Sequence, residues 1–476
     1  MIALTLAEIA AATSGDIAPE RASAVTVTGP VVIDSRQAVP GSLFAALPGE
    51  RVDGHDYAAA AARNGAAAIL ATRPLPEAGA PVIVVADVTL ALGMLARAVL
   101  ARLPGATVVG ITGSSGKTST KDLTAQVVER LGPTIAPEGS LNNEIGLPLT
   151  VLRADEATKY LILEMSARGI GHIAYLTGIA PPRIGAVLNV GHAHAGEFGS
   201  IDAVAKAKGE LVEALPAGSA GGVAVLNADD PNVAAMAART EARVVTTSVD
   251  PAGPQSHRDA DVRAAGLTLD DLGRASFTLH TRAGSAPVTL TLHGGHHVAN
   301  ALAAAAVAAE LGMEVSAIAD ALTAATARSK KRMELHERRD GVLVVNDAYN
   351  ANPDSTRAAI EALAHLTRNG RRGLAVLGYM AELGDIAAQS HEDAGRLAAR
   401  AGAAVIVAVG AGAAPVLDGA RAEEGWHGEA VAAPDPKAAV EAVRNRLRPG
   451  DVVLVKASKA AGLWEVADGL LVEDDQ

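Results

Sequence analysis

The segment GITGSSGKTST, residues 110–120, combines residue types that bind phosphate groups. Its glycines permit the tight, positive-φ backbone of a loop whose amide groups point at an anion. In such a loop Lys117 would reach the outer phosphates of a nucleotide, and the hydroxyl of Thr118 would hold Mg2+. The spacing departs from the strict phosphate-loop pattern, because isoleucine stands at position 111 and Gly110 comes one residue early. The alternative is an ordinary glycine-rich turn with an exposed lysine.

Polar side chains also follow several apolar runs further along the chain. Glu164 lies near the end of YLILEM, His194 follows IGAVLNV, and Asp347 precedes Tyr349 and Asn350. At the ends of parallel strands such groups converge on one ligand. A carboxylate and a histidine beside a phosphate loop suit two-metal phosphoryl transfer, while an aspartate and a tyrosine suit ribose and adenine. Taken singly, each of these residues has an ordinary alternative: it is a surface side chain or part of a polar turn.

Three further sites each have two interpretations. Asn142, Asn143 and Glu144 in SLNNEIGLP bind a polar ligand or cap the following helix, and the local pattern favours the cap. Asn300 either caps a helix or recognises a base with its amide. Lys208 either faces solvent or points inward, because at helical spacing it shares a face with the apolar residues Val204, Leu211 and Leu215. Burial is costly for a bare ammonium group.

These side chains require a scaffold of alternating strands and helices. Residues 106–112 form a β-branched run that predicts a buried strand, and residues 117–131 have helical spacing. The pattern of strand followed by helix continues along most of the chain, with one hairpin-like antiparallel stretch at 267–294. After residue 328 we expect four more strands, at 341–349, 370–378, 403–410 and 451–458. The sequence therefore predicts an α/β fold.

Length and composition set further limits. A chain of 476 residues is too long for one core, and we predict domains at 1–105, 106–327 and 328–476. Apolar residues make up 49% and the net charge is −12, which argues against nucleic-acid binding. There is no cysteine. No apolar run approaches the ~18 residues of a membrane span, and the N-terminus lacks a basic signal-peptide region. We expect a cytoplasmic protein with no membrane insertion.

In their order along the chain, these motifs resemble those of the Mur ligase family. The resemblance covers nearly the whole length and is strongest to the members that join D-alanyl-D-alanine to UDP-N-acetylmuramoyl-tripeptide. It rests on the segments GSLFAALPGERVDGHDY, GITGSSGKTSTKD, SLNNEIGLP, AHAGEFGS, AKGEL, HHVANALAA, VVNDAYNANPDS, YMAELGD and GDVVLVKAS. The family's phosphate loop has the short form TGxxGKT, so Ile111 is an ordinary residue there.

The resemblance implies a three-domain architecture and a reaction. An N-terminal domain would grip the UDP end of the substrate, a central phosphate-loop domain would bind ATP, and a Rossmann-like domain would complete the site. ATP, with Mg2+, would convert the peptide carboxylate to an acyl phosphate, which the incoming amine then attacks. The products would be ADP, phosphate and a peptidoglycan precursor. We expect the enzyme to act as a monomer.

The resemblance also assigns residues. Catalytic roles would fall to Lys117, Lys208 and His194, and metal ions would be held by Thr118, Glu164 and His194. The nucleotide would contact Gly113, Ser114, Ser115, Gly116, Lys117, Thr118, Ser119, Asn300, Arg332 and Asp347. The other substrates would contact Ser35, Arg36, Asn142, Asn143, Glu144 and Asn350. Lys208 matches a lysine that several family members carry as a carbamate, an anion that could help to hold the second metal ion.

The chain departs from the family pattern at a few positions. Ser166 replaces the glycine of EMGA, and His172 replaces the glutamate of GEI. Ala457 and Lys459 stand in KASK where the family has KGSR. None of these changes removes a predicted ATP or metal contact. Ser166 and Ala457 add side chains at positions where glycine permits a close backbone approach, so we expect them to alter activity or substrate preference.

Two other functions explain part of the pattern. One is a different amino-acid ligase of the same superfamily, but the DNPR-like motif of the tripeptide-forming members is absent and a folate polyglutamate ligase would not explain SLNNEIGLP. The other is a non-catalytic nucleotide-binding paralogue. The presence of Lys117, Glu164, His194 and Lys208 argues against that alternative.

Overall fold

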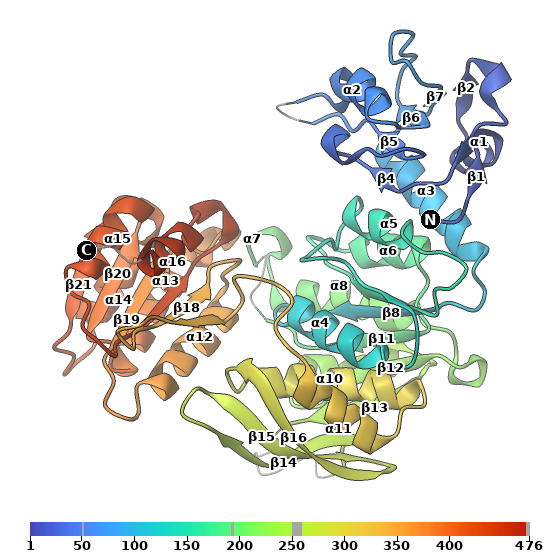
Figure 1. Ribbon diagram of the computed structural model, residues 1–476. Coiled ribbons are helices and arrows are strands. Elements are labelled where there is room, and N and C mark those ends of the chain that lie inside the picture. The colour runs from blue at the N-terminus through green and yellow to red at the C-terminus, as the bar shows by residue number, and fades with distance from the viewer. Residues whose placement is uncertain (50–51, 192–194, 250–258, 473–476) are drawn as a thin grey trace.

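The structure is a computed structural model that describes residues 1–49, 52–191, 195–249 and 259–472. Among these residues the strands form sheets of nine, six, five and two strands. Figure 1 shows the three larger sheets as separate layers, with helices packed around each of them. The fold is α/β, as the alternation of apolar runs and helical segments predicts.

The five-stranded sheet belongs to the N-terminal part. Its order is β2 (Asp16–Ala18), β7 (Val82–Val84), β6 (Ala68–Ala71), β5 (Leu43–Ala45) and β4 (Val31–Val32), with β2 antiparallel to the rest. The helices α1 (Leu6–Thr13) and α2 (Ala58–Arg63) accompany this sheet. A capping box starts α1: Thr5 Oγ1 accepts from the Glu8 amide, and the Glu8 carboxylate accepts from the Thr5 amide.

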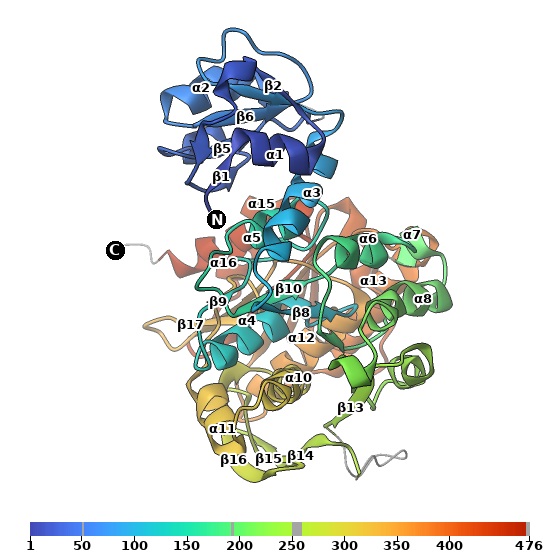
Figure 2. The ribbon, with the colours of Figure 1, turned by 90° about the vertical axis from the view of Figure 1, so that its right-hand side faces the viewer.

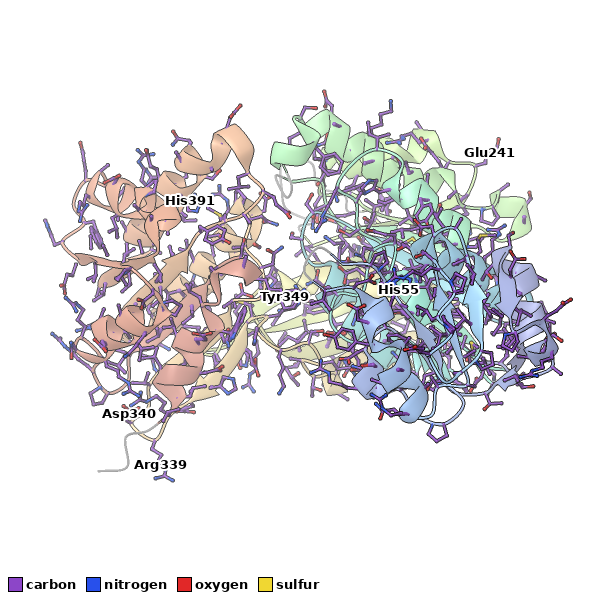
Figure 3. The ribbon with its side chains drawn as sticks, turned by 90° about the horizontal axis from the view of Figure 1, so that it is seen from above. His55, Glu241, Arg339, Asp340, Tyr349 and His391 are labelled. Atoms are coloured by element: carbon purple, nitrogen blue, oxygen red, sulfur yellow. The ribbon has the colours of Figure 1, made fainter. Side chains whose placement is uncertain are left out.

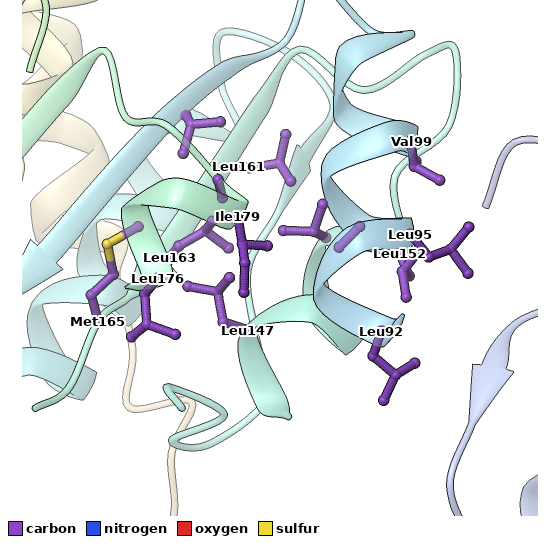
Figure 4. Packing of buried hydrophobic residues seen from close by; sticks show 14 of the residues in the cluster. Leu92, Leu95, Val99, Leu147, Leu152, Leu161, Leu163, Met165, Leu176 and Ile179 are labelled. Carbon is purple, nitrogen blue, oxygen red and sulfur yellow. The ribbon is translucent and has the colours of Figure 1, made fainter. Parts of the chain in front are cut away.

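Helix α3 (Val88–Ala101) connects the N-terminal sheet to the central part of the molecule. It packs against α1 on one side and against α5 (Gly146–Val151) and α6 (His172–Ile179) on the other (Figure 2). Figure 4 shows apolar residues of all three helices meeting those of β10 (Tyr160–Glu164). The two parts therefore share one apolar cluster, which includes Leu92, Leu95, Leu147, Leu161 and Ile179.

The nine-stranded central sheet places the phosphate-loop strand near its middle. Its order is β16 (Gly284–His293), β15 (Arg274–Thr281), β14 (Val262–Leu269), β13 (Arg243–Ser248), β12 (Val223–Asn227), β11 (Ile184–Val187), β8 (Thr107–Thr112), β10 and β9 (Thr134–Ile135). Strands β14 to β16 form the expected antiparallel extension. Because β8 lies between β10 and β11 and all three are parallel, the segments that follow them emerge at one edge.

The C-terminal sheet has the order β17 (Glu334–Glu337), β18 (Leu343–Asp347), β22 (Val452–Lys456), β19 (Gly373–Gly378), β20 (Val405–Val409) and β21 (Glu429–Ala433). All neighbours are parallel except β17 with β18. The four strands expected in this region are present. The edge strands β17 and β21 were not predicted, because their sequences ELHE and EAVAA lack an extended apolar run.

Two predicted boundaries differ from the structure. The strand expected at 184–190 ends at Val187, and the following residues lead into the site instead. Helix α10 (His297–Glu310) begins before Asn300. No helix in the described ranges is long and apolar enough to cross a membrane.

Candidate active site

A cavity of about 430 Å3 lies between the ends of the central strands and the C-terminal part. From the central part it is lined by the phosphate loop, the 140–144 segment and the residues after β10. From the C-terminal part it is lined by residues that include Arg332, Asp347, Tyr349, Asn350 and Lys456. Figure 3 shows Tyr349 at the boundary between these two parts. The cavity thus joins predicted site residues more than 200 positions apart in the sequence.

The phosphate loop occupies the turn between β8 and α4 (Lys117–Val128). The amides of Ser114 and Ser115 both donate to Asn189 Oδ1, each at 2.9 Å, so the residue that follows β11 holds the loop from the side. Lys117 is half-buried, and its Nζ donates to the Gly113 carbonyl at 2.7 Å. Burial lowers the pKa of Lys117, while the charge of Glu164 opposes this shift. The lysine is therefore less exposed than a simple loop-mouth position would make it.

Asn300 lies directly behind the phosphate loop. It is buried, and its Oδ1 accepts from Thr120 Oγ1 at 3.1 Å. A Cβ at position 116 would come within 2.6 Å of that same oxygen, and the φ of Gly116 is +78°, so both space and backbone require glycine there. The helix-cap interpretation of Asn300 is wrong, because the N-cap position of α10 is His296.

A network of short hydrogen bonds surrounds Glu164. Thr118 Oγ1 donates to Glu164 Oε2 at 2.7 Å, and Asn142 Nδ2 donates to Oε1 at 2.6 Å. The Ser140 hydroxyl lies 2.7 Å from Thr118 Oγ1. Among the described residues, no group of three or more histidine, aspartate or glutamate side chains is arranged so that it could hold a metal ion. One carboxylate and one hydroxyl beside a phosphate-binding loop are nevertheless a donor set that suits Mg2+, whose other ligands are phosphate oxygens and water.

Lys208 points inward from α8 (Ile201–Glu213), as its apolar face predicts. Only 3% of its surface is exposed. Burial lowers the pKa of Lys208 well below its usual value, and the positive charge of Lys117 lowers it further. Within the described ranges no hydrogen bond or ion pair joins Lys208 Nζ to another residue. Lys206, two positions earlier on the same helix, is exposed.

The C-terminal side of the cavity is built around Asp347. Asp347 and Lys456 lie opposite each other on the neighbouring strands β18 and β22, and their side chains form an ion pair of 2.6 Å. The other carboxylate oxygen of Asp347 accepts from the Met333 amide at 3.1 Å. Arg332 stacks on the Tyr349 ring, with its guanidinium carbon 4.2 Å from the ring centre.

Arg332 also joins the two sides of the cavity. Its Nη2 donates to Ser140 Oγ at 2.7 Å, so a residue next to the C-terminal sheet contacts the network around Glu164. Asn352 makes a second connection, because it caps α12 (Pro353–Leu366) while its Nδ2 lies 3.5 Å from the Ser114 carbonyl. The two halves of the site are thus in direct contact.

The remaining predicted residues occupy several positions. Asn143 Oδ1 accepts from the Gly146 amide at 2.9 Å at the start of α5, which agrees with the capping interpretation, and Glu144 is exposed at the cavity. Asn350 is exposed beside Lys456. Ser35 and Arg36 lie in the N-terminal part and do not line this cavity; Ser35 is buried, and Arg36 pairs with Asp34. His194 lies outside the described residues.

Several residues that shape the cavity were not singled out from the sequence: Ser140, Arg168, Asn189 and Lys456. The first three stand in segments that follow a strand and precede a helix, and Lys456 is the final residue of β22. The positions at which the sequence departs from the family pattern lie in different surroundings. Ser166 and His172 line the cavity, whereas Ala457 is fully buried. A Cβ at Gly378 would lie 2.7 Å from that of Ala457, so the added methyl packs against a neighbouring glycine.

A phosphate loop that faces a second parallel-sheet domain across a polar cavity defines a multidomain nucleotide-binding α/β enzyme. Family models match along the chain: the Mur ligase family catalytic domain at residues 30–123, the Mur ligase middle domain at 111–308, and the Mur ligase glutamate ligase domain at 331–459. The chain belongs to the Mur ligase family.

Individual relatives agree with this assignment. The UDP-N-acetylmuramoyl-tripeptide--D-alanyl-D-alanine ligase of Mycobacterium tuberculosis is 51% identical over 100% of this chain and 99% of that protein. The structure of UDP-N-acetylmuramoylalanyl-D-glutamyl-2,6-diaminopimelate--D-alanyl-D-alanyl ligase from Acinetobacter baumannii superimposes with a TM-score of 0.84, at 31% identity over 99% of each chain. The MurF ligase of Thermotoga maritima in complex with ADP has a TM-score of 0.79, at 29% identity over 93% of this chain and 97% of that one.

Proposed function

We propose that this enzyme is an ATP-dependent ligase that adds D-alanyl-D-alanine to UDP-N-acetylmuramoyl-tripeptide in peptidoglycan precursor synthesis. The observation that carries the proposal is the 51% identity over the full chain to a ligase of that name. The cavity supports it, because a phosphate loop and a second domain with polar groups both face the space where the substrates must meet.

ATP would bind in the cavity with its phosphates at the loop. The N-terminus of α4 and Lys117 would receive the β- and γ-phosphates, once Nζ leaves the Gly113 carbonyl. Asn300, behind the loop, and Arg332 and Asp347, across the cavity, would contact the rest of the nucleotide. The ADP complex of the Thermotoga maritima relative supports the use of ATP in this fold.

Thr118 and Glu164 fit one Mg2+, and His194 is the proposed ligand of a second. When bound, Mg2+ would neutralise the charge that develops on the transferring phosphoryl group. Asn142 would hold the Glu164 side chain in place, since its amide already donates a hydrogen bond to one carboxylate oxygen. Such outer contacts fix the orientation of a ligating carboxylate.

The reaction would proceed in two steps. A carboxylate oxygen of the tripeptide attacks the γ-phosphorus of ATP, so that ADP leaves and an acyl phosphate forms. The neutral amine of D-alanyl-D-alanine then attacks the acyl carbon, loses a proton, and expels phosphate through a tetrahedral intermediate. The main contributions of the protein would be to position the reactants and to hold compensating charge near the phosphate.

We also propose that Lys208 acts as a carbamate. Its neutral amine would add to CO2 and release one proton, which converts a buried neutral amine into an anion. The low pKa of Lys208 favours the neutral amine that this step requires, and no described residue neutralises an ammonium group there. The anion would then help to hold the second metal ion.

Phosphate release tests the function directly. Turnover should require ATP, UDP-N-acetylmuramoyl-tripeptide and D-alanyl-D-alanine together, because the acyl phosphate must form before the amine attacks. Omitting D-alanyl-D-alanine should reduce phosphate release to background. Turnover with a single amino acid but not with the dipeptide would assign the chain to a different ligase, and no turnover with any acceptor would favour a non-catalytic paralogue.

A further inference from the structure

Four lysine or arginine side chains line the cavity in the described part of the chain. Three of them, Lys117, Arg332 and Lys456, donate to a protein oxygen at 2.7, 2.7 and 2.6 Å. Across the ranges that the structure describes, neither a hydrogen bond nor an ion pair joins the guanidinium of the fourth, Arg168, to a protein group. Arg168 is therefore the cation of this set that is available for an anionic ligand.

The loop that carries Arg168 is fixed at its first end by the central sheet. It begins directly after Glu164, the proposed metal ligand. The Met165 amide donates to the Ile111 carbonyl at 2.9 Å, and the Ser166 amide donates to the Asn142 carbonyl at 3.0 Å. Arg168 is exposed only two residues beyond these anchors, so the position of its Cα is tied to the metal and phosphate site.

The second end of the loop is fixed by a buried carboxylate. Glu210, on the same helix as Lys208, accepts from the Gly171 amide at 2.6 Å and from the Ala174 amide at 3.0 Å. These bonds satisfy two backbone amides at the start of α6 and hold the first residue of this helix, His172, at the cavity. The Arg168 amide donates to His172 Nδ1 at 3.3 Å, which places the ring proton on Nε2. Arg168 and His172 thus both offer hydrogen-bond donors.

We propose that Arg168, assisted by His172, binds a carboxylate of the UDP-N-acetylmuramoyl-peptide that takes no part in the reaction. The proposal rests on the proposed function and names a contact that determines which peptide is accepted. An arginine recognises a carboxylate with two parallel hydrogen bonds, a geometry that a lysine cannot reproduce.

The substrate chemistry supplies suitable carboxylates. The Acinetobacter baumannii relative is named for a peptide with D-glutamyl and 2,6-diaminopimelate residues. A glutamyl residue joined through one carboxyl keeps the other, and diaminopimelate keeps one carboxylate when the other is activated. A peptide of this kind therefore has two carboxylates that ATP does not activate. The hydrogen-bond donors of Arg168 and His172 could bind either of them.

The position of the loop favours the peptide over ATP or D-alanyl-D-alanine. Helix α6, which follows the loop, packs against α3, and α3 leads to the N-terminal sheet. Figure 1 shows α6 on the side of the central domain that faces the N-terminal sheet. A substrate held by its UDP end in the N-terminal part would pass this loop before its reacting carboxylate reached Lys117.

Steady-state kinetics of the full-length enzyme test the proposal. Arg168→Ala should raise KM for the UDP-peptide about 10- to 100-fold, because it removes a charge-assisted hydrogen bond. KM for ATP and kcat should stay within about 2-fold of the wild-type values. The KM of Arg168→Lys for the UDP-peptide should lie between those of the wild type and Arg168→Ala, because lysine keeps the charge but cannot form the two parallel hydrogen bonds of a guanidinium group. Arg153→Ala is the matched control, since Arg153 is an exposed arginine of the same domain that does not line the cavity.

Modified peptides identify the carboxylate. One substrate carries an amide in place of the free glutamyl carboxylate, and the other carries lysine in place of diaminopimelate. The wild type should discriminate against one of them, and Arg168→Ala should lose that discrimination. An unchanged KM for the UDP-peptide in Arg168→Ala, an equal rise in KM for ATP, or the same discrimination in both enzymes would overturn the proposal. Failure of the proposed function would differ, because the wild type itself would then show no turnover.

Discussion

Thr118 Oγ1 lies 2.7 Å from Glu164 Oε2, although Thr118 follows strand β8 and Glu164 is the last residue of strand β10. The contact exists because β8 and β10 are parallel neighbours, so that the residues after one strand meet those after the other. Asn142 donates to the second carboxylate oxygen of Glu164 at 2.6 Å. The carboxylate is thus oriented from both sides in the way that a metal ligand requires.

The first prediction concerns this orientation. Asn142→Ala should raise the Mg2+ concentration for half-maximal phosphate release about 10- to 100-fold, because it removes an outer contact of the proposed ligand. The control is Asn445→Ala, a change at an exposed asparagine that does not line the cavity. A Mg2+ dependence in Asn142→Ala equal to that of the wild type would show that Glu164 does not act through this contact.

The second prediction separates activity from stability at Lys117. Lys117→Ala should lower the rate of phosphate release about 100-fold or more, since it removes a cation from the transferring phosphate. The free energy of unfolding should change by about 1 kcal/mol or less, because Nζ makes a single hydrogen bond, to the Gly113 carbonyl, from a half-buried position. Urea unfolding measures the second quantity. Near-normal turnover would return the loop to the role of an ordinary turn.

The third prediction tests the sign of the charge at Lys208. Lys208→Ala should lose most activity, and acetate should restore part of it by supplying an anion in place of the carbamate. Lys206→Ala is a closely matched control, because this lysine is on the same helix but exposed. Rescue by a small amine instead of acetate would mean that a cation is needed there, and the carbamate would be excluded.

The fourth prediction concerns pH and stability at His391. Its Nε2 accepts from the Met380 amide at 2.8 Å and its Nδ1 lies 2.6 Å from the Ala387 carbonyl, so the ring is neutral when both bonds form. Burial lowers the pKa of His391 below the usual 6.5, although the bond to Ala387 opposes the shift. A base with a lowered pKa in the folded state contributes stability above its unfolded pKa and loses it as the pH falls.

The free energy of unfolding should therefore decrease as the pH falls from about 6.5 towards the pKa of the folded state. His391→Gln should show a shallower decrease over this range than the wild type. His296 and His297 also have pKa values lowered by burial, so part of the decrease should remain. Urea unfolding at several pH values measures the slope. An identical slope in His391→Gln would contradict the assigned neutral ring.

Local sequence patterns were sufficient for the buried strands next to the site, but not for the edge strands β17 and β21. The apolar runs of β8 and β10 and the apolar face of α8 predicted that Thr118 follows a strand, that Glu164 lies at the end of one, and that Lys208 points inward. Burial leaves a strong pattern in such elements. The resemblance to the Mur ligases then supplied the three-domain architecture and the order of the motifs.

Other features depend on contacts between distant segments and leave no local signal. Asn300 looks like a helix cap in the sequence, but tertiary packing places it behind Gly116, in the fourth position of α10. Asn189 follows a strand that is shorter than its apolar run suggests, and its support of the phosphate loop requires the neighbouring β8. Arg168 is an ordinary exposed arginine until the fold brings its loop to the cavity.

The central claim is that D-alanyl-D-alanine is the amine acceptor. Its most direct test is the mass of the product formed from UDP-N-acetylmuramoyl-tripeptide and ATP in a mixture of D-alanyl-D-alanine, D-alanine and free L-amino acids at equal concentrations. We predict one ligated product, heavier than the substrate by one D-alanyl-D-alanine residue pair, with one ADP formed for each product. A product that contains a single amino acid instead of the dipeptide would contradict the account.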